Sequence, residues 1–222
     1  MVRPSKSLDV ALLQAGRELF PRVGCAGLSV RAVAEQAGAN LGMFHYHFKT
    51  KENFLRMLLQ QAYEEMFDGL THAISHEGPA IARLRDALIV VGGMLREHRR
   101  LFARVWMDAV SGEPVAMEFL SGNAPRHVGL LLALLQQAQA EGALREMPPI
   151  QRFFTLMGAV LLPILFASGL VDVAIDAPAF RQQFDEQVMS DEAIAQRVDL
   201  VLDMLRRPTD AVTRTRRRSP SA

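Results

Sequence analysis

Apolar residues recur at intervals of three and four along most of the chain, and little of the sequence alternates with a period of two. This spacing predicts amphipathic α-helices rather than strands. The N-terminal part predicts four helices: one from residue 8 to a stop at Val23-Gly24, one between Ser29 and Gly38, one over 41–48, and one from 51 to about 72. Ser29, Asn40 and Thr50 precede the last three, and their side-chain oxygens can cap the unpaired first amides.

The rest of the chain continues the helical pattern. It predicts helices over residues 80–98, 100–110, 114–141, 149–171 and 191–207. The third of these is expected to loosen at 121–125, and the connection 172–190 to be a loop with a short helical piece. Residues after Pro208 show no periodicity, which predicts a disordered tail. We therefore expect an all-α protein with about nine helices.

Residues 153–171, FFTLMGAVLLPILFASGLV, form a run without any charge that is almost long enough to span a membrane. Pro163 lies near its middle, no basic cluster flanks it, and the chain has no second run of this kind. A helix that is apolar on all sides in a water-soluble protein is buried, either inside a domain or between subunits. We favour this second interpretation, a buried interface helix, and expect no membrane contact.

Composition narrows the class of protein. The chain has 222 residues, half of them hydrophobic, which is enough for one or two compact domains. The single cysteine, Cys25, excludes a disulfide framework and multi-cysteine metal sites, and we expect an inert thiol. The first ten residues contain no apolar core of the kind that a signal peptide has, so the expected compartment is the cytoplasm.

Charge is unevenly distributed although the net charge is only +1. Residues 1–56 hold eight basic and four acidic residues, residues 57–205 hold eleven and nineteen, and residues 206–222 hold six and one. A basic N-terminal part on an acidic body favours a polyanionic partner for that part alone. The alternative is an ordinary solvated surface.

Residues 28–51, LSVRAVAEQAGANLGMFHYHFKTK, contain a helix, a tight turn at Ala37-Gly38-Ala39, and a second short helix. This is the spacing of a helix-turn-helix unit, in which the second helix enters the DNA major groove. Phe44 and Phe48 lie four residues apart and are expected to anchor that helix to the core. The candidate DNA-contacting residues are Ser29, Arg31, Asn40, Leu41, Gly42, Met43, His45, Tyr46, His47, Lys49 and Lys51.

The stretch from Ala11 to about Leu59, ALLQAGRELF…LSVRAVAEQAGANLGMFHYHFKTKENFLRMLL, closely resembles the N-terminal domain of the TetR family of bacterial transcriptional regulators. The resemblance implies a homodimeric protein that binds a double-stranded DNA operator, usually as a repressor released by a small ligand. It covers about fifty residues; the remainder matches only in length and helical pattern. We expect residues 1–50 to form the DNA-binding domain, 51–207 an effector-binding and dimerisation domain, and 208–222 a disordered basic tail.

Three positions depart from the pattern of that family. Pro21 falls near the end of the first helix and is expected to end or kink it early. Met43 stands where threonine is usual, and His45 replaces the usual first tyrosine of a Tyr-Tyr-His-Phe string. DNA binding is still expected, but not the family's familiar operator preferences.

The body offers residues for a small apolar effector and for a second subunit. Flexible thioethers and aromatic rings suit an adaptable cavity, although the same residues are also ordinary core residues. The candidate effector-binding residues are Met94, Phe102, Trp106, Met107, Met117, Phe119 and Met157. The candidate dimer residues, on the last two predicted helices, are Leu162, Leu165, Phe166, Val198 and Leu202.

Other chemistries are disfavoured. His45 and His47 lie about 200° apart around a helix, so a shared metal is not expected, and His47 is either a structural cap or a phosphate donor. Paired Ser/His/Asp residues, a glycine-rich phosphate loop and a metal-spaced cluster are all lacking, so we expect no enzyme and no cofactor. The remaining alternative is a DNA-binding regulator without a small effector, switched by a protein partner or acting as an activator.

Overall fold

The computed structural model describes residues 8–167, 169–171 and 175–207. In these ranges the chain is all-α, as the sequence predicts, with ten α-helices, two of them followed directly by a π-helical turn, and no strand. The elements are α1 (Leu8–Gly27), α2 (Val30–Gln36), α3 (Leu41–Phe48), α4 (Lys51–Ala73), α5 (Ala80–Glu97), α6 (Arg99–Val110), α7 (Pro114–Ala140), α8 (Pro149–Leu162), η2 (Pro163–Ala167), α10 (Pro178–Phe184), η3 (Asp185–Met189) and α11 (Asp191–Leu205).

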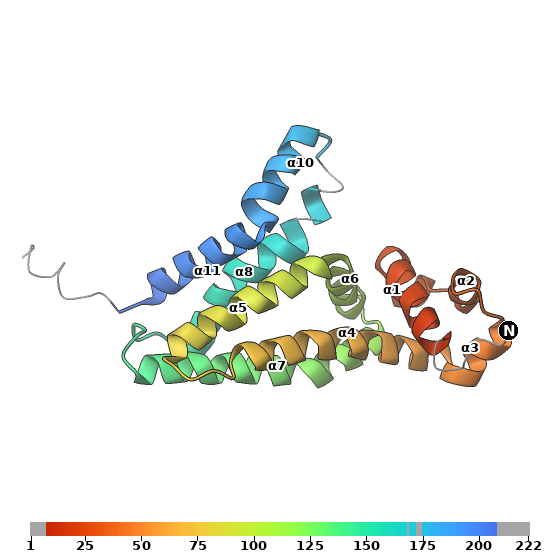
Figure 1. Cartoon of the computed structure of the whole chain (residues 1–222), viewed down its shortest axis with the longest axis horizontal. Helices are drawn as coiled ribbons and strands as arrows, with labels where there is room; N and C mark the ends of the chain where they lie inside the picture. Colours follow the sequence, from red (N-terminus) through yellow and green to blue (C-terminus); the bar gives the residue numbers. More distant parts are fainter. Residues whose placement is uncertain (1–7, 168, 172–174, 208–222) are drawn as a thin grey trace, which may run out of the picture.

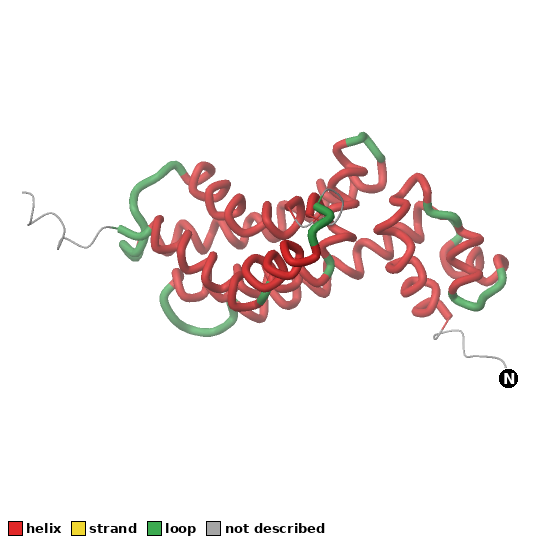
Figure 2. The backbone as a smooth tube through the Cα atoms, turned by 90° about the horizontal axis from the view of Figure 1, so that it is seen from above, coloured by secondary structure: helices red, strands yellow, loops and turns green. Residues whose placement is uncertain are grey.

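Helices α1, α2 and α3 form a small head at one end of an elongated molecule (Figure 1). The long helix α4 begins beside α3 and runs from the head into the body, alongside α7. The view from above shows a helical body whose helices are joined by loops, with two wide loops at the end away from the head (Figure 2). Since α4 contacts α1 and α3 as well as α5 and α7, it connects the head to the body mechanically.

The core of the head is aromatic. The rings of Phe44, Phe48 and Phe54 are completely buried, and their centroids lie 4.9–5.3 Å apart. Gly16 on α1 faces Phe54 so closely that a Cβ atom there would overlap the ring. This confirms the predicted anchoring role of Phe44 and Phe48, and it fixes α3 against α1 and α4.

Helix α1 is broken where the sequence predicts a stop, but not at its proline. The backbone at Gly24 has φ 68°, a left-handed conformation that glycine adopts without strain. The helix passes through Pro21 and resumes after Gly24 as far as Gly27. The break therefore belongs to Gly24, and the expectation of an early end at Pro21 is wrong.

Two further expectations about the body need correction. Helix α7 continues through residues 121–125 with Pro125 inside it, and it packs against α4, α5 and α6. The connection 172–190 is more helical than predicted, since α10 and η3 occupy most of its described part. The predicted disordered tail, 208–222, lies outside the described residues.

One helical run of the described residues, Pro149–Val171, is long and apolar enough to cross a membrane by length and composition. Its buried residues Phe153, Leu156 and Val160 are covered by the rest of the chain, and α8 contacts α5, α7 and α11. Only 29% of its most apolar window is buried within the chain, so the other described residues are half-buried or exposed in the single chain.

Candidate nucleic-acid interface

Capping side chains define the start of each helix in the predicted helix-turn-helix. The side-chain oxygens of Ser29, Asn40 and Thr50 accept hydrogen bonds from the backbone N–H groups of Ala32 (3.4 Å), Met43 (2.9 Å) and Asn53 (3.1 Å). These bonds satisfy amides that a helix leaves unpaired at its start. The three predicted caps are confirmed, and two of them fix both ends of the α3 segment.

Helix α3 has a buried face and a free face. Phe44 and Phe48 fill the core, whereas Leu41, Gly42, His45 and Tyr46 are exposed, with Tyr46 66% exposed. Met43 and His47 lie half-buried between the two faces. On the neighbouring elements Ser29, Arg31 and Asn40 are exposed. Most of the predicted DNA-contacting residues are therefore exposed on the surface of the head.

Lys49 forms a strained turn at the end of α3. Its backbone has φ 65° and ψ −57°, and the Thr50 N–H donates to the Phe48 carbonyl at 2.7 Å across it. This is a γ-turn with positive φ, which is rare for a residue with a side chain. His45 Nδ1 lies 3.1 Å from the Lys49 carbonyl, and the Lys49 ammonium lies 5.6 Å from the Tyr46 ring. The turn thus presents an exposed ammonium beside the free face of α3.

Lys51 and His47 have a different setting from Lys49. The Lys51 ammonium donates to the Ala26 carbonyl at 2.8 Å, which ties the start of α4 to the end of α1. His47 Nε2 is buried and has no hydrogen-bond partner. In the described ranges, no three His, Cys, Asp or Glu side chains converge on a possible metal site.

The residues predicted for an effector are not gathered around one cavity. Phe119 and Met157 are buried, Met94 and Phe102 are half-buried, and Trp106, Met107 and Met117 are 48–60% exposed. Trp106 and Met117 share a shallow apolar groove of about 300 Å³ with Val110 and Leu120. Met107 lies in a separate recess of about 480 Å³ between α6 and η2. The effector assignment stays a prediction.

The residues predicted for the dimer divide into two groups. Leu162 and Phe166 are 55% and 41% exposed, and Leu165 is half-buried. Val198 and Leu202 point into the core of the same chain, where they are at most 2% exposed, so they cannot offer a free surface. On α11 the exposed apolar residues are Leu200 and Met204 instead.

From the sequence, only part of an apolar stripe on α8 and its continuation was identified, namely Leu162 and Phe166. Ile150, Phe154, Leu162, Phe166 and Leu170 are all at least 41% exposed. Successive members lie four or eight residues apart, so members four apart share a face of the helix, while the row as a whole winds gradually around it. The signal was present in the sequence, but a run that is apolar on every side conceals which face is free. We call these five residues the α8 stripe.

A second missed cluster joins head and body. The Cys25 N–H on α1 donates to Asp108 Oδ2 on α6 at 2.7 Å, and Arg104 Nε donates to Asp108 Oδ1 at 2.8 Å. Arg104 Nη2 also donates to the Val23 carbonyl at 3.2 Å. Burial, with Glu113 and Asp108 beside the thiol, raises the pKa of Cys25 well above its ordinary value. The thiol is therefore protonated and unreactive at neutral pH.

A capped, exposed second helix on a compact three-helix head, joined by α4 to a helical body, defines a helix-turn-helix DNA-binding regulator. The family model of the bacterial regulatory proteins of the tetR family matches residues 12–58. The chain is 30% identical over 144 residues to the HTH-type transcriptional repressor Rv3405c of Mycobacterium tuberculosis, covering 61% of this chain and 69% of the relative. This chain belongs to the TetR family of transcriptional regulators.

More distant relatives share the whole architecture. The probable HTH-type transcriptional regulator YttP of Bacillus subtilis is 19% identical over 182 residues, 80% of this chain and 88% of the relative. A TetR-family regulator from Marinobacter aquaeolei has a TM-score of 0.65 at 18% identity, over 91% of this chain and 97% of that one. PfmR of Thermus thermophilus has a TM-score of 0.64 at 18% identity, over 86% of this chain and 97% of that chain. These structural likenesses extend the shared fold through the body.

Proposed function

We propose that this TetR-family regulator is a cytoplasmic homodimeric repressor that leaves its operator when a small, largely apolar ligand binds the body. The observation that carries this proposal is the pairing of one small reading head with the uncovered α8 stripe. A single short reading helix makes too few base contacts for useful specificity, so two half-sites are needed. The α8 stripe, with Leu200 and Met204 on α11, offers an apolar surface for a second copy.

The proposed division of the chain follows the sequence prediction: residues 1–50 read DNA, residues 51–207 bind the effector and the partner copy, and 208–222 form a basic tail. In the head, Leu41, Gly42, Met43 and Tyr46 are proposed to face base edges. The polar residues are proposed to contact phosphates or to orient the helix: Ser29, Arg31, Asn40, His45, His47, Lys49 and Lys51. Phosphate contacts position a protein on the duplex, whereas base contacts specify sequence.

Release of the operator requires that the ligand bind more tightly to one of two conformations of the protein, which differ in the placement of the heads. Helix α4 spans head and body, so a small tilt of α4 changes the separation of the two reading helices. That separation must be about 34–36 Å for entry into successive major grooves. A coupling free energy of about 1–3 kcal/mol is enough for a 5- to 150-fold loss of operator affinity.

The test is an electrophoretic shift on the DNA upstream of the protein's own gene, with light scattering of the same preparation. We expect a specific shift by a dimer, weakened by a lipophilic compound that also binds the protein without DNA. A monomer at micromolar concentration, or no specific shift, contradicts the proposal.

One observation favours the alternative of a partner-switched regulator. The groove with Trp106, Val110 and Met117 is open and almost entirely apolar, which suits a protein partner as well as a small molecule. If no compound weakens operator binding while the dimer still binds DNA, this alternative replaces the ligand-released repressor.

A further inference from the structure

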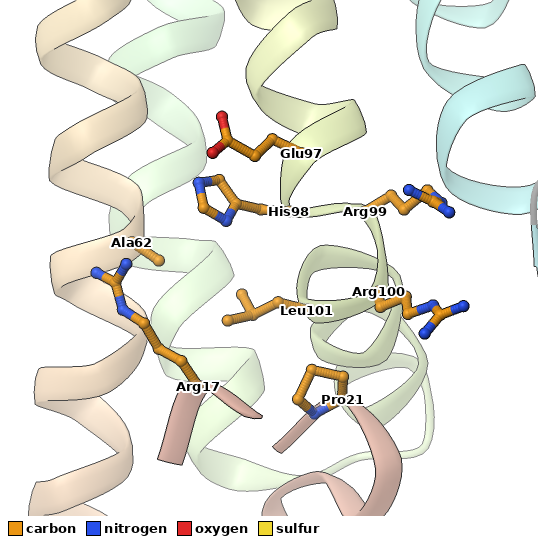
Figure 3. A pocket seen from close by; sticks show the side chains of 8 residues that line it. All are labelled: Arg17, Pro21, Ala62, Glu97, His98, Arg99, Arg100 and Leu101. Carbon is orange, nitrogen blue, oxygen red and sulfur yellow. The ribbon is translucent and has the colours of Figure 1, made fainter. Parts of the chain in front are cut away.

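Two recesses adjoin where the head meets the body. The first, of about 400 Å³, lies between α1, α4 and the α5–α6 corner (Figure 3), and is lined by Arg17, Pro21, Ala62, Glu97, His98, Arg99, Arg100 and Leu101. The second, of about 480 Å³, continues along α6 to η2. Both are lined by Pro21, Arg99 and Arg100, so together they form one trough, which we call the junction trough.

One end of the junction trough is cationic. It contains the N-terminus of α6, whose N-cap residue His98 makes no side-chain capping bond. The N-terminus of a helix carries a partial positive charge and unpaired N–H groups. Arg99, the first residue of α6, adds a guanidinium whose Nε–H is buried without an acceptor. This end therefore has the donors and the charge that bind an anion.

Arg99 has no counter-charge among the described residues. Arg17 is paired with Glu65 at 2.6 Å, and Arg104 is paired with Asp108 at 2.8 Å. No described carboxylate lies within ion-pair distance of Arg99, whose Nη1 donates to the Arg96 carbonyl at 3.4 Å. Glu97 also lines the trough, but it is exposed at the edge. A buried donor on a charged group without an acceptor is costly, and a carboxylate would satisfy it.

The other end of the junction trough is apolar. Its lining beyond the arginines consists of Ala103, Met107, Leu165, Phe166, Gly169 and Leu170. Met107 and Leu170 are 60% and 64% exposed, which leaves apolar surface uncovered beside the cationic end. From Arg99 to Met107 the trough follows α6 for about 12 Å, from the rise per residue of an α-helix. That is the length of an alkyl chain of medium size.

We propose that the junction trough binds an amphipathic anion, namely a carboxylate on an unbranched alkyl chain. The carboxylate lies at Arg99 and the N-terminus of α6, and the chain lies along Met107 and Phe166. Because Pro21 of α1 forms part of the wall, such a ligand contacts head and body at once. Phe166 and Leu170 also belong to the α8 stripe, so the apolar end is shared with the surface proposed for the second copy. The effect of the ligand on operator binding rests on the proposed function.

The binding test uses the full-length protein without DNA and calorimetric titration with decanoate. 1-Decanol supplies the chain without the charge, and acetate supplies the charge without the chain. We expect decanoate to bind and each half-ligand to bind at least about tenfold more weakly, because each loses one set of contacts. If 1-decanol binds as tightly as decanoate, the assignment of Arg99 to the carboxylate is overturned. If acetate binds as tightly as decanoate, the assignment of the apolar end to the alkyl chain is overturned.

Matched variants locate the site. Arg99→Gln is expected to weaken decanoate binding about tenfold, the usual worth of a charge-assisted hydrogen bond. Its control is Arg83→Gln, since Arg83 also has a buried Nε without a partner and donates to a neutral acceptor, Gln137. Met107→Gln is expected to weaken binding about fivefold, and Val110→Gln, which lines the other groove, to change it less than about twofold. Circular dichroism checks folding; folded variants that bind like the wild type overturn the proposal.

Two further readouts separate this site from the proposed function. The ring of Trp106, the chain's single tryptophan, lies 6.3 Å from Phe166 between centroids, so decanoate is expected to change its fluorescence. Operator affinity is measured in parallel. Binding that depends on Arg99 but leaves operator affinity unchanged supports the site and contradicts ligand release through it. An operator that is released by other compounds, with no decanoate binding, overturns the site alone.

Discussion

The Asp108 carboxylate on α6 accepts a hydrogen bond from the backbone N–H of Cys25 on α1, with 2.7 Å between Oδ2 and N. Asp108 is 7% exposed, and its other oxygen accepts from Arg104. Gly24 completes this cluster, because a Cβ atom there would overlap the Arg104 guanidinium. The kink of α1 is therefore shaped to receive a charged pair from the body. This contact couples the orientation of the head to α6, in addition to the connection between head and body that α4 makes.

Asp108→Ala is expected to lower the free energy of unfolding by about 1–3 kcal/mol, because it leaves the buried Cys25 N–H without an acceptor and removes the carboxylate that pairs with Arg104 Nε. Urea denaturation measures the change. The control is Asp203→Ala, which removes an exposed ion pair with Arg206 and should cost less than about 1 kcal/mol. Equal effects of the two substitutions would contradict a structural role for the Asp108 contact.

The Cys25 thiol is expected to resist thiol reagents in the folded protein. Its pKa is raised by burial and by the neighbouring Glu113 and Asp108, so the reactive thiolate is scarce. A pKa that is higher in the folded state stabilises the fold below the unfolded pKa of about 8.5, and this contribution is lost as the pH rises above it. Reaction with Ellman's reagent at pH 8 should be slow without urea and fast in it. Rapid reaction of the native protein would contradict this prediction.

Lys49 and Lys51 are expected to respond differently to substitution. Lys49 is exposed beside the reading face, so Lys49→Ala should weaken binding to all sequences and lower the salt slope by about one. The Lys51 ammonium donates to the Ala26 carbonyl, so Lys51→Ala should also lower the free energy of unfolding, by about 1 kcal/mol. Fluorescence anisotropy over a salt series measures the salt slope of DNA binding, and urea denaturation measures the free energy of unfolding. The prediction fails if Lys51→Ala leaves stability unchanged.

Lys49→Gly tests the strained turn separately from the charge. Glycine adopts φ 65° without the steric cost of a Cβ, so this variant should be about 1 kcal/mol more stable than Lys49→Ala. Both variants lack the ammonium, so their salt slopes should agree. If Lys49→Gly is no more stable than Lys49→Ala, the turn holds no strain.

The head was predictable because its features are local. Ser29, Asn40 and Thr50 cap helices through bonds that span three residues, and such bonds leave a signature in the sequence. The spacing of Phe44 and Phe48 identifies the buried face of α3 in the same way. Nothing local, however, indicates that Lys51 finds an acceptor in Ala26, twenty-five residues earlier.

The body was harder because its surfaces depend on packing between distant segments. Val198 and Leu202 have the same helical spacing as interface residues, but η3, α5 and α8 surround α11 and bury that face within the chain. Arg99 shows the same difficulty in the junction trough. Its lack of a counter-ion among the described residues depends on which distant carboxylates the fold brings near it, and periodicity does not show this. Periodicity predicts which helices are amphipathic but not which neighbours cover them.

Leu162→Glu is expected to disrupt the proposed dimer. Leu162 lies in the middle of the α8 stripe and is 55% exposed, so a charge is tolerated in the single chain but not in an apolar contact. In a two-fold interface each substitution occurs twice, so the dimer should weaken by about 100-fold or more. Analytical ultracentrifugation measures this. Val110→Glu, equally apolar and more exposed on α6, is the control; assembly that tolerates Leu162→Glu as well as Val110→Glu rules out the α8 stripe as the interface.

His127 on α7 is expected to make stability depend on pH. Burial lowers its pKa below the ordinary value, and its Nδ1 lies 3.3 Å from the Tyr63 hydroxyl, with the Arg126–Glu64 ion pair beside them. A base whose pKa is depressed on folding stabilises the fold above its unfolded pKa of about 6.5, and this contribution is lost as the pH falls. The Glu64 carboxyl, whose pKa is lowered by its hydrogen bond with Arg126, acts in the same direction but only nearer pH 4. Urea denaturation at pH 7.5 and pH 5.5 should therefore show a decrease that His127→Gln reduces. His72→Gln, which replaces an exposed imidazole, should retain the full decrease, and an equal decrease in His127→Gln would assign the pH dependence to other groups.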